Sequence, residues 1–528
     1  MAAQDLTIHP TPTATAGFGQ SRSKTWLVEP QLEFVKSYND IHKIKAIVGT
    51  SLRHQTNASY LNVGTGYTND AFLGSIDHAP VKIFSDENRQ YRLQSLYGLV
   101  NYNYKRKYLV EFTGRRDGSS RFGPEKQFGN FYSIAAGWVF SNENFFKKWF
   151  PVFSYGKIRV SHGTSGNDQI GDYEFLDAWT NTTYPYLPDI PGYVPTKLYN
   201  NSFGWEVHKS TDISLNLGFL DDKILISAVY NTSKTNNQLI SYNLPSQTGF
   251  TSVLRNSGAS VGNKNYEFEV STVNVSKDNF KWTSSANLTI SRNKLLNFPD
   301  LASSTYRNYV VVGQPLNVVM GYRTNGVNPN SGIYEILDRN GNPLDLSNGP
   351  PQSNEDMINL GDYSPRFYGG FFNGIQYRNW KLDVLFQFVK QKGVNYNITR
   401  GQNAGYSQFN MPYVLSNRWE KPGDIAPYQR LTQDGSSEAA IAAFLYTMSD
   451  ATVVDASYVR LRTLSLSYSL PYQWIRKITI KSCNLFVQGQ NLLTFTKYKG
   501  NHDPENGTIN TTGLPPLRII NIGVQASF

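Results

Sequence analysis

The stretch YLVEFTGRRDGSSRFG, residues 108–123, alternates apolar and polar side chains before it ends in charged and small residues. Tyr108, Val110 and Phe112 fall on one side of the alternation. Successive side chains of a β-strand point to opposite faces, so this period of two predicts a strand with one apolar face. Gly, Ser and Asp at the end of the stretch are typical of turns. The stretch therefore predicts a strand that leads into a polar loop.

The same alternation recurs along the chain and indicates an all-β protein. It is clearest near residues 132–140, 382–388, 464–470 and 520–528. We expect these strands to be about 9–14 residues long, against the usual ~5–6, and a strand of about 9–11 residues crosses a bilayer. No apolar run approaches the ~18 residues of a membrane helix. The pattern favours a transmembrane antiparallel β-barrel.

The predicted connections alternate in length. Short links are expected near 38–42, 105–107, 219–222, 277–280 and 378–379, and slightly longer ones at 141–154 and 471–477. Between them lie long polar segments at 54–90, 116–129, 163–210, 233–261, 292–365, 391–455 and 496–515. Outer-membrane barrels alternate short periplasmic turns with long extracellular loops in this way. Tyr102, Tyr104 and Tyr108 would then form an aromatic girdle beside a short turn.

The expected strand count is odd. About 15 strands can be counted, whereas bacterial single-chain barrels have an even number. Residues 1–23 are rich in Pro and Thr and are expected to be irregular, and residues 24–528 to be barrel. The first 20 residues also lack the basic and apolar regions of a secretory signal. These features predict the C-terminal part of a longer barrel.

Composition argues against several other classes of protein. The net charge of +10 is spread along the chain, which does not favour a nucleic-acid-binding protein. The single cysteine, Cys483, permits no disulfide framework and is expected to be an inert strand residue. The seven histidines show no metal-ligand spacing, and no nucleophile elbow or phosphate loop occurs. We therefore expect neither an enzyme nor a resident metal or cofactor.

Several ordered segments resemble the SusC/RagA family of outer-membrane TonB-dependent transporters. The first is residues 97–145, with RRDGSSRFG at its centre. Others are GKIRVSHGTSGNDQIGDYEF (156–175), LGDYSPRFYGGFFNGIQYRNWKLDVLFQF (360–388), NRWEKPGD (417–424), ASYVRLRTLSLSYSLP (456–471) and NLFVQGQNLLTFTKYKG (484–500). The resemblance covers residues 40–528 and is carried most specifically by the first and last segments.

The resemblance implies a barrel of about 22 strands around an N-terminal plug, of which this chain would hold about 15 strands and no plug. It implies import of bulky nutrients, oligosaccharides or peptides, across the outer membrane of a Gram-negative, Bacteroidetes-like cell. The implied partners are a SusD-like surface lipoprotein, TonB–ExbB–ExbD acting through the plug region, the barrel-assembly machinery and outer-membrane lipid. A passive pore, or a surface glycan-binding barrel without energy coupling, is the alternative; a soluble glycan-binding β protein fits the long strands poorly.

Aromatic residues in two long loops are candidates for substrate binding. Flat rings match the C–H faces of sugars, but they also pack loops against themselves. The candidates are Tyr184, Tyr186, Tyr193, Tyr199 and Trp205 in the first loop, and Tyr396, Arg400, Tyr406 and Tyr413 in the second.

Three further motifs have competing interpretations. Arg115, Arg116, Asp117 and Arg121 either contact substrate or brace a tight loop, and bracing fits their small neighbours better. The segment DRNGNPLDLSNG, 338–349, departs from the family's calcium-like run and favours a plain Asn340-Gly341 turn over a metal loop. Phe528 at the end of an alternating strand resembles a barrel-assembly signal, and it is also suited to face lipid.

Overall fold

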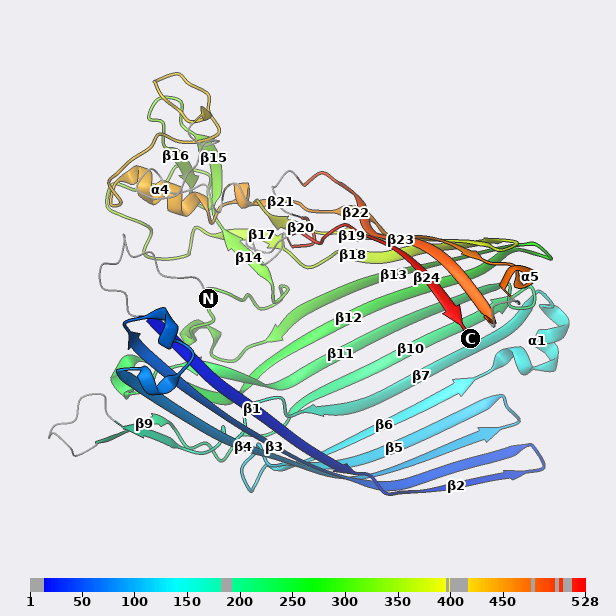
Figure 1. Ribbon diagram of the computed structural model, residues 1–528. Coiled ribbons are helices and arrows are strands. Elements are labelled where there is room, and N and C mark those ends of the chain that lie inside the picture. The colour runs from blue at the N-terminus through cyan, green and yellow to red at the C-terminus, as the bar shows by residue number, and fades with distance from the viewer. Residues whose placement is uncertain are drawn as a thin grey trace. The chain divides into compact units, whose positions relative to one another are not determined.

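The computed structural model describes residues 14–181, 192–395, 398, 416–475, 480–498, 503–506 and 515–528. These residues form a mostly β structure dominated by one 16-stranded antiparallel sheet, which confirms the predicted fold class. Within the described ranges, no helix is long and apolar enough to cross a membrane. Figure 1 shows the strands of the sheet as long arrows joined largely in chain order.

The strands of the large sheet pair in the order β1-β3-β4-β5-β6-β7-β10-β11-β12-β13-β18-β19-β22-β23-β24, with β2 also on β3. Their bounds are β1 Ala14–Val28, β2 Gln31–Tyr38, β3 His42–Tyr67, β4 Val81–Tyr104, β5 Tyr108–Ser119, β6 Phe128–Trp138, β7 Phe153–Asn167, β10 Glu206–Phe219, β11 Ile224–Asn243, β12 Ser252–Lys277, β13 Phe280–Asn297, β18 Phe367–Tyr377, β19 Trp380–Lys390, β22 Tyr458–Ser469, β23 Ser482–Thr496 and β24 Ile519–Ser527.

The start of the sheet corrects one expectation. Residues 14–23 were expected to be irregular, but they belong to β1, which pairs continuously with the second half of β3. β2 pairs with the first half of β3, so β1 and β2 are two pieces of one position in the sheet. Pro30 separates them because proline has no N–H to donate to the ladder. The sixteen strands thus fill fifteen positions, the number that alternation predicted.

Several strands are much longer than the expected 9–14 residues. β3 and β12 have 26 residues each, and β4 has 24. The segment 54–90, which was expected to be a loop, is therefore mostly strand, because β3 continues to Tyr67 and β4 begins at Val81. The alternation fades there because both faces are polar, while the backbone ladder between the two strands continues unbroken from His42 to Thr65.

The short links are tight turns with left-handed backbone at non-glycine residues. Asn39 and Asp40 have φ values of 50° and 54°, and Lys105 and Arg106 have 52° and 54°. Two consecutive residues with positive φ match the right-handed twist of the paired strands. At the second turn, the ring centroids of Tyr104 and Tyr108, two of the three residues of the predicted girdle, lie 6.3 Å apart.

The chain divides into two compact units. The first comprises residues 1–136, 162–209 and 235–257, and the second residues 137–161, 210–234 and 258–528. Smaller elements occupy the connections: β8 Ala178–Asn181, β9 Tyr193–Lys197, β14 Val318–Gly321, β15 Arg323–Val327, β16 Tyr334–Leu337, β17 Ile358–Asp362, β20 Lys392–Val394, β21 Val453–Asp455, α1 Asn144–Trp149, α4 Glu438–Tyr446, α5 Tyr472–Ile475, and 3-10 turns Asp70–Phe72, Ile76–His78, Phe140–Asn142, Ser246–Thr248, Leu301–Ser303 and Asp450–Thr452.

In the second unit, α4 packs against the hairpin of β15 and β16, as Figure 1 shows. Ser437 caps the helix by accepting a hydrogen bond from the backbone N–H of Ala440. Small alanines along α4 allow close approach, and the ring of Tyr446 stacks on Tyr334 at 3.7 Å. The segment 391–455, expected to be a long polar loop, therefore contains a small folded layer with its own apolar core.

A buried ion network in the second unit fixes a connecting segment onto the sheet. Arg460 on β22 is 1% exposed and donates from Nη2 to both carboxylate oxygens of Asp503 at 2.5 Å. Its Nη1 donates to Glu505 at 2.6 Å, and Arg462 donates to the same carboxylate at 3.0 Å. A buried guanidinium is stable only with such complete pairing. Residues 503–506 are therefore anchored to the sheet by Arg460 and Arg462 of β22.

We predict that Arg460→Met destabilises the folded barrel by about 3–5 kcal/mol, because it leaves two carboxylates without their buried partner. The measurement is the temperature at which the protein loses the anomalous electrophoretic mobility of a folded barrel. Arg462→Met is the matched control, since its side chain is one-third exposed, and it should cost about 1 kcal/mol or less. Equal effects of the two variants would contradict the network's role.

Candidate functional site

An aromatic cluster lies at the loop ends of the strands in the first unit. Phe122, Phe131, Phe203 and Trp205 form a buried core. The ring of Trp205 lies 5.2 Å from Phe122 and 5.5 Å from Phe131, and its Nε1 donates to the backbone oxygen of Gln127 at 2.9 Å. These contacts join the connection after β5 to the segment that enters β10. Trp205 is 9% exposed, so it packs the loops rather than offering a ring to a ligand.

A polar network surrounds this core. Asp168 accepts hydrogen bonds from the hydroxyls of Ser119 at 2.7 Å and Tyr91 at 2.8 Å. Arg121 donates from Nε to Asp172 at 2.9 Å and from Nη1 to the backbone oxygen of Asp168 at 3.0 Å. The same guanidinium lies 4.2 Å from the Tyr91 ring centroid. Arg121 thus ties the RRDGSSRFG loop to residues 168–172.

The other charged residues of the motif divide between the two faces of β5. Arg115 pairs with Asp117 at 2.6 Å and donates to the hydroxyl of Ser95 at 2.8 Å. Arg116, one residue along, lies on the opposite face, 4.9 Å from the Phe128 ring and 3.4 Å from the amide oxygen of Asn130. Arg115, Asp117 and Arg121 therefore bond to neighbouring strand and loop residues; that the motif braces the loop rather than contacts substrate stays a prediction.

The predicted aromatic binding residues have different placements. Tyr184, Tyr186, Tyr396, Arg400, Tyr406 and Tyr413 lie outside the described residues. Tyr193 and Tyr199 are 65% and 56% exposed and available for contact. Tyr193 shares one face of the β8–β9 hairpin with Trp179, since Trp179 pairs with Pro195 and Asn181 with Tyr193. Sequence reasoning did not single out Trp179.

The second unit has a hollow lined by flexible apolar side chains. It measures about 830 Å³ and is lined by Met320, Met357 and Met448 together with Val318 and Val319. Three of the five methionines of the chain therefore meet at one place. Methionine is unbranched and polarizable, so its side chains adapt to varied apolar groups. The hollow suits a ligand with changeable apolar parts.

The methionine hollow also has amide side chains in its lining and a second, more polar hollow beside it. Asn308, Asn317, Asn354 and Gln391 also line it. A second hollow of about 570 Å³ shares Ser364 and Pro365 with it and adds the charged side chains of Arg292, Asp362 and Arg366. Together the two hollows offer apolar contact next to hydrogen-bonding and charged groups. Sequence reasoning did not find them, because their residues come from connections far apart in the chain.

The segment 338–349 forms a turn closed by its own aspartate. The Asp338 carboxylate accepts hydrogen bonds from the backbone N–H groups of Asn340 and Asn342, both at 2.8 Å, and Gly341 has a φ of 92°. These bonds, led by that from Asn342, lower the pKa of Asp338. A bridge between Leu337 and Pro343 closes the base of the turn. Among the described residues, no three acidic, His or Cys side chains are grouped as metal ligands would be.

We predict that Arg121→Met releases residues 168–172 from the RRDGSSRFG loop. Loss of charge-assisted hydrogen bonds worth about 2 kcal/mol should accelerate protease cleavage in these loops roughly tenfold or more in the folded protein. The measurement is the cleavage rate by a broad-specificity protease. Arg89→Met, which removes an exposed ion pair with Glu87, is the control and should leave the rate unchanged. Indistinguishable rates for the two variants would refute the bracing role.

Comparison with known proteins gives related sequences over nearly the whole chain, although no family model matches. The chain is 28% identical to the TonB-dependent receptor P3 of Formosa agariphila, over 97% of this chain and 53% of the relative. It is 27% identical to the TonB-dependent receptor SusC of Bacteroides thetaiotaomicron, over 83% of this chain and 44% of the relative. The chain thus spans about half the length of the curated relatives it matches.

The fold comparison agrees with the sequence comparison. The RagAB peptide transporter structure superposes with a TM-score of 0.82 at 22% identity, covering 98% of this chain and 56% of that chain. The structure of the RagAB importer in its closed-closed state gives a TM-score of 0.80 at 21% identity. The large sheet therefore has the same fold as the matching part of those structures. In sequence along nearly its whole length, and in fold, the chain is similar to TonB-dependent receptors of the SusC/RagA type.

Proposed function

We propose that the chain is the C-terminal barrel portion of an outer-membrane importer of bulky nutrients. The relatives are TonB-dependent receptors, and the similar solved structure is a peptide transporter. β1 and β24 stand at the two ends of the strand order, each with one neighbour among the described strands. In this proposal, residues 1–528 are one part of a longer barrel. The other strands of that barrel pair with β1 and β24, and its plug closes the lumen.

The observation that carries a substrate assignment is the methionine hollow. Its adaptable apolar wall beside backbone-like amide partners suits peptides with varied side chains better than the uniform hydroxyls of a glycan. The exposed faces of Trp179 and Tyr193 provide the stacking surface that an oligosaccharide needs, so this hairpin is the second candidate. The RagAB name includes a partner subunit, and we assign a SusD-like lipoprotein to this receptor by analogy.

We predict that a Met357→Gln/Met448→Gln pair of substitutions weakens peptide binding about tenfold, because amides bury less favourably against apolar side chains. The measurement is binding of a mixed peptide library to the complete receptor. The pair Trp179→Ala/Tyr193→Ala is the control and should leave peptide binding unchanged. If the methionine pair leaves peptide binding unchanged, and the Trp179→Ala/Tyr193→Ala pair loses binding of oligosaccharides, the substrate is a glycan.

Energy coupling has a separate test. Uptake by cells carrying the complete receptor should fall to background when a protonophore collapses the proton-motive force that TonB–ExbB–ExbD transmits. Uptake that persists unchanged would identify a passive pore.

The proposed partner has its own test. Affinity purification from the same cells should recover a SusD-like lipoprotein in about equal amount, and its absence would contradict the proposed partner.

A further inference from the structure

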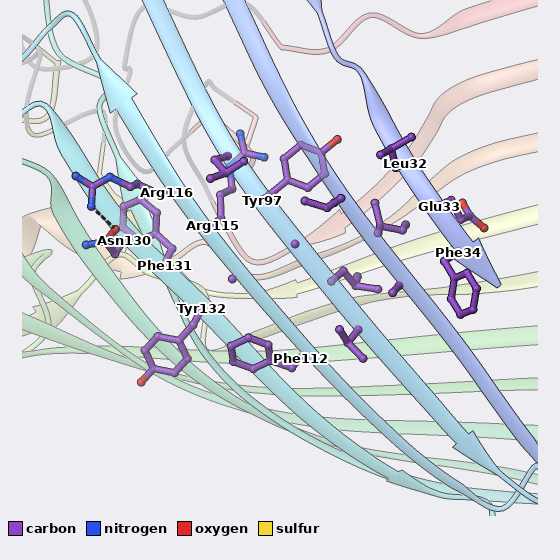
Figure 2. A pocket seen from close by; sticks show the side chains of 18 residues that line it. Leu32, Glu33, Phe34, Tyr97, Phe112, Arg115, Arg116, Asn130, Phe131 and Tyr132 are labelled. Carbon is purple, nitrogen blue, oxygen red and sulfur yellow. Dashed lines mark hydrogen bonds between the residues drawn. The ribbon is translucent and has the colours of Figure 1, made fainter. Parts of the chain in front are cut away.

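A groove of about 900 Å³ lies on the face of the first unit that carries the exposed apolar side chains of β4 and β5. Figure 2 shows Phe112 and Tyr132 on one side of this groove, Leu32 and Phe34 on another, and Arg116 with Asn130 at one end. All of its lining residues belong to the first unit. The groove is therefore a feature of one continuous patch of sheet, which we call the outer groove.

Two paired glycines create the hollow. Gly98 on β4 lies opposite Gly114 on β5, and the flanking pairs are Leu96 with Arg116 and Val100 with Phe112. A Cβ placed on Gly114 would first meet the Phe112 ring at 3.7 Å, and one on Gly98 would first meet a backbone oxygen at 3.7 Å. Both distances are ordinary contacts, so the space above the glycines is open. The apolar walls come from neighbours that the glycines leave uncovered.

The groove faces the membrane rather than the lumen. Leu96, Val100 and Phe112, all at even positions, are exposed, Leu96 by 61%. The odd positions of the same strands carry Arg115 and Asp117, which pair with each other, and Arg115 also donates to Ser95. Tyr97 and Arg115 of this second face border the groove at its edge only, while the exposed apolar walls come from the even positions. In an outer-membrane barrel the apolar face meets lipid and the polar face meets the lumen. The outer groove is thus continuous with the lipid-contacting surface.

Cationic and aromatic side chains gather above the groove, toward the long loops. Trp26, His54 and Arg92 form one row across β1, β3 and β4 on the same face. They line a second hollow of about 400 Å³ together with Phe128, whose ring contacts Arg116. Aromatic residues and cations at this depth are typical of the headgroup region. The apolar groove thus leads into a positively charged rim.

We propose that the outer groove binds an acyl chain of an anionic, phosphate-bearing lipid of the surrounding leaflet, with the phosphate held by Arg116 and Arg92. A guanidinium has five N–H donors in a planar fork that matches phosphate oxygens. The contact of Arg116 with Asn130 is long, at 3.4 Å, and the Phe128 ring, 4.9 Å from the guanidinium carbon, accepts no conventional hydrogen bond from it. The acyl chain lies above Gly98 and Gly114, which have no side chains of their own, and against the Phe112 ring. This assignment depends on the membrane-embedded sheet and not on transport.

The test is native mass spectrometry of the complete receptor in detergent, titrated with phosphorylated lipid A as the probe. The wild-type receptor should retain the lipid, and an Arg92→Gln/Arg116→Gln pair should lower the retained fraction roughly tenfold, because two charge-assisted contacts are lost. Gly114→Leu should lower it to a similar extent by filling the groove with its own side chain. Phosphatidylcholine, which has no net charge, should be retained weakly by every variant.

Arg378→Gln is the matched control. Arg378 also lies over an aromatic ring, that of Tyr377, at 5.5 Å, but in a short turn of the second unit. It should retain lipid like the wild type, and heat-modifiable electrophoretic mobility verifies that each variant is folded. Equal retention by all variants would overturn the proposal. Loss in the arginine pair without loss in Gly114→Leu would also overturn it, since the phosphate would then bind with no chain in the groove.

Discussion

The constraint on which this structure depends is that a backbone in hydrocarbon must satisfy every N–H and C=O within the protein. Antiparallel ladders meet this requirement, and the pairing of β3 with β4 runs without a break over 24 residue pairs. Because the ladder uses the backbone alone, side chains are free to differ completely between the two faces. The apolar face and the polar face of each strand follow from that freedom.

The long connections are ordered by a different kind of interaction. Outside the membrane the hydrophobic face is no longer required, and the loops are held by charged groups paired in partly buried surroundings. Arg121 with Asp172 and Arg460 with Asp503 are two independent cases, each joining segments more than 40 residues apart. In each case an arginine near the end of a strand anchors a connection and holds it close to the sheet.

The two proposed ligand sites lie in different parts of the chain and suit different ligands. The methionine hollow belongs to the connections of the second unit, where flexible side chains stand beside amides. The outer groove belongs to the apolar face of the first unit, where two glycines remove side chains from an otherwise covered surface. On the sheet of the first unit, the paired glycines leave part of the apolar face without side chains, whereas Arg115 and Asp117 on the other face bond to each other and to Ser95.

The sequence by itself determined the fold class, the approximate number of sheet positions and, where the alternation is clear, which strand residues share a face. These properties are local, because period-two alternation and tight turns depend on residues that are close in the sequence. It was wrong about residues 14–23 and about where β3 and β4 end, since a ladder between polar strands leaves no alternation. Only the tertiary structure decided that Trp205 is buried, that Trp179 and Tyr193 share a face, and that three methionines and two glycines form hollows. Those facts depend on register and on contacts between distant segments, which no local pattern specifies.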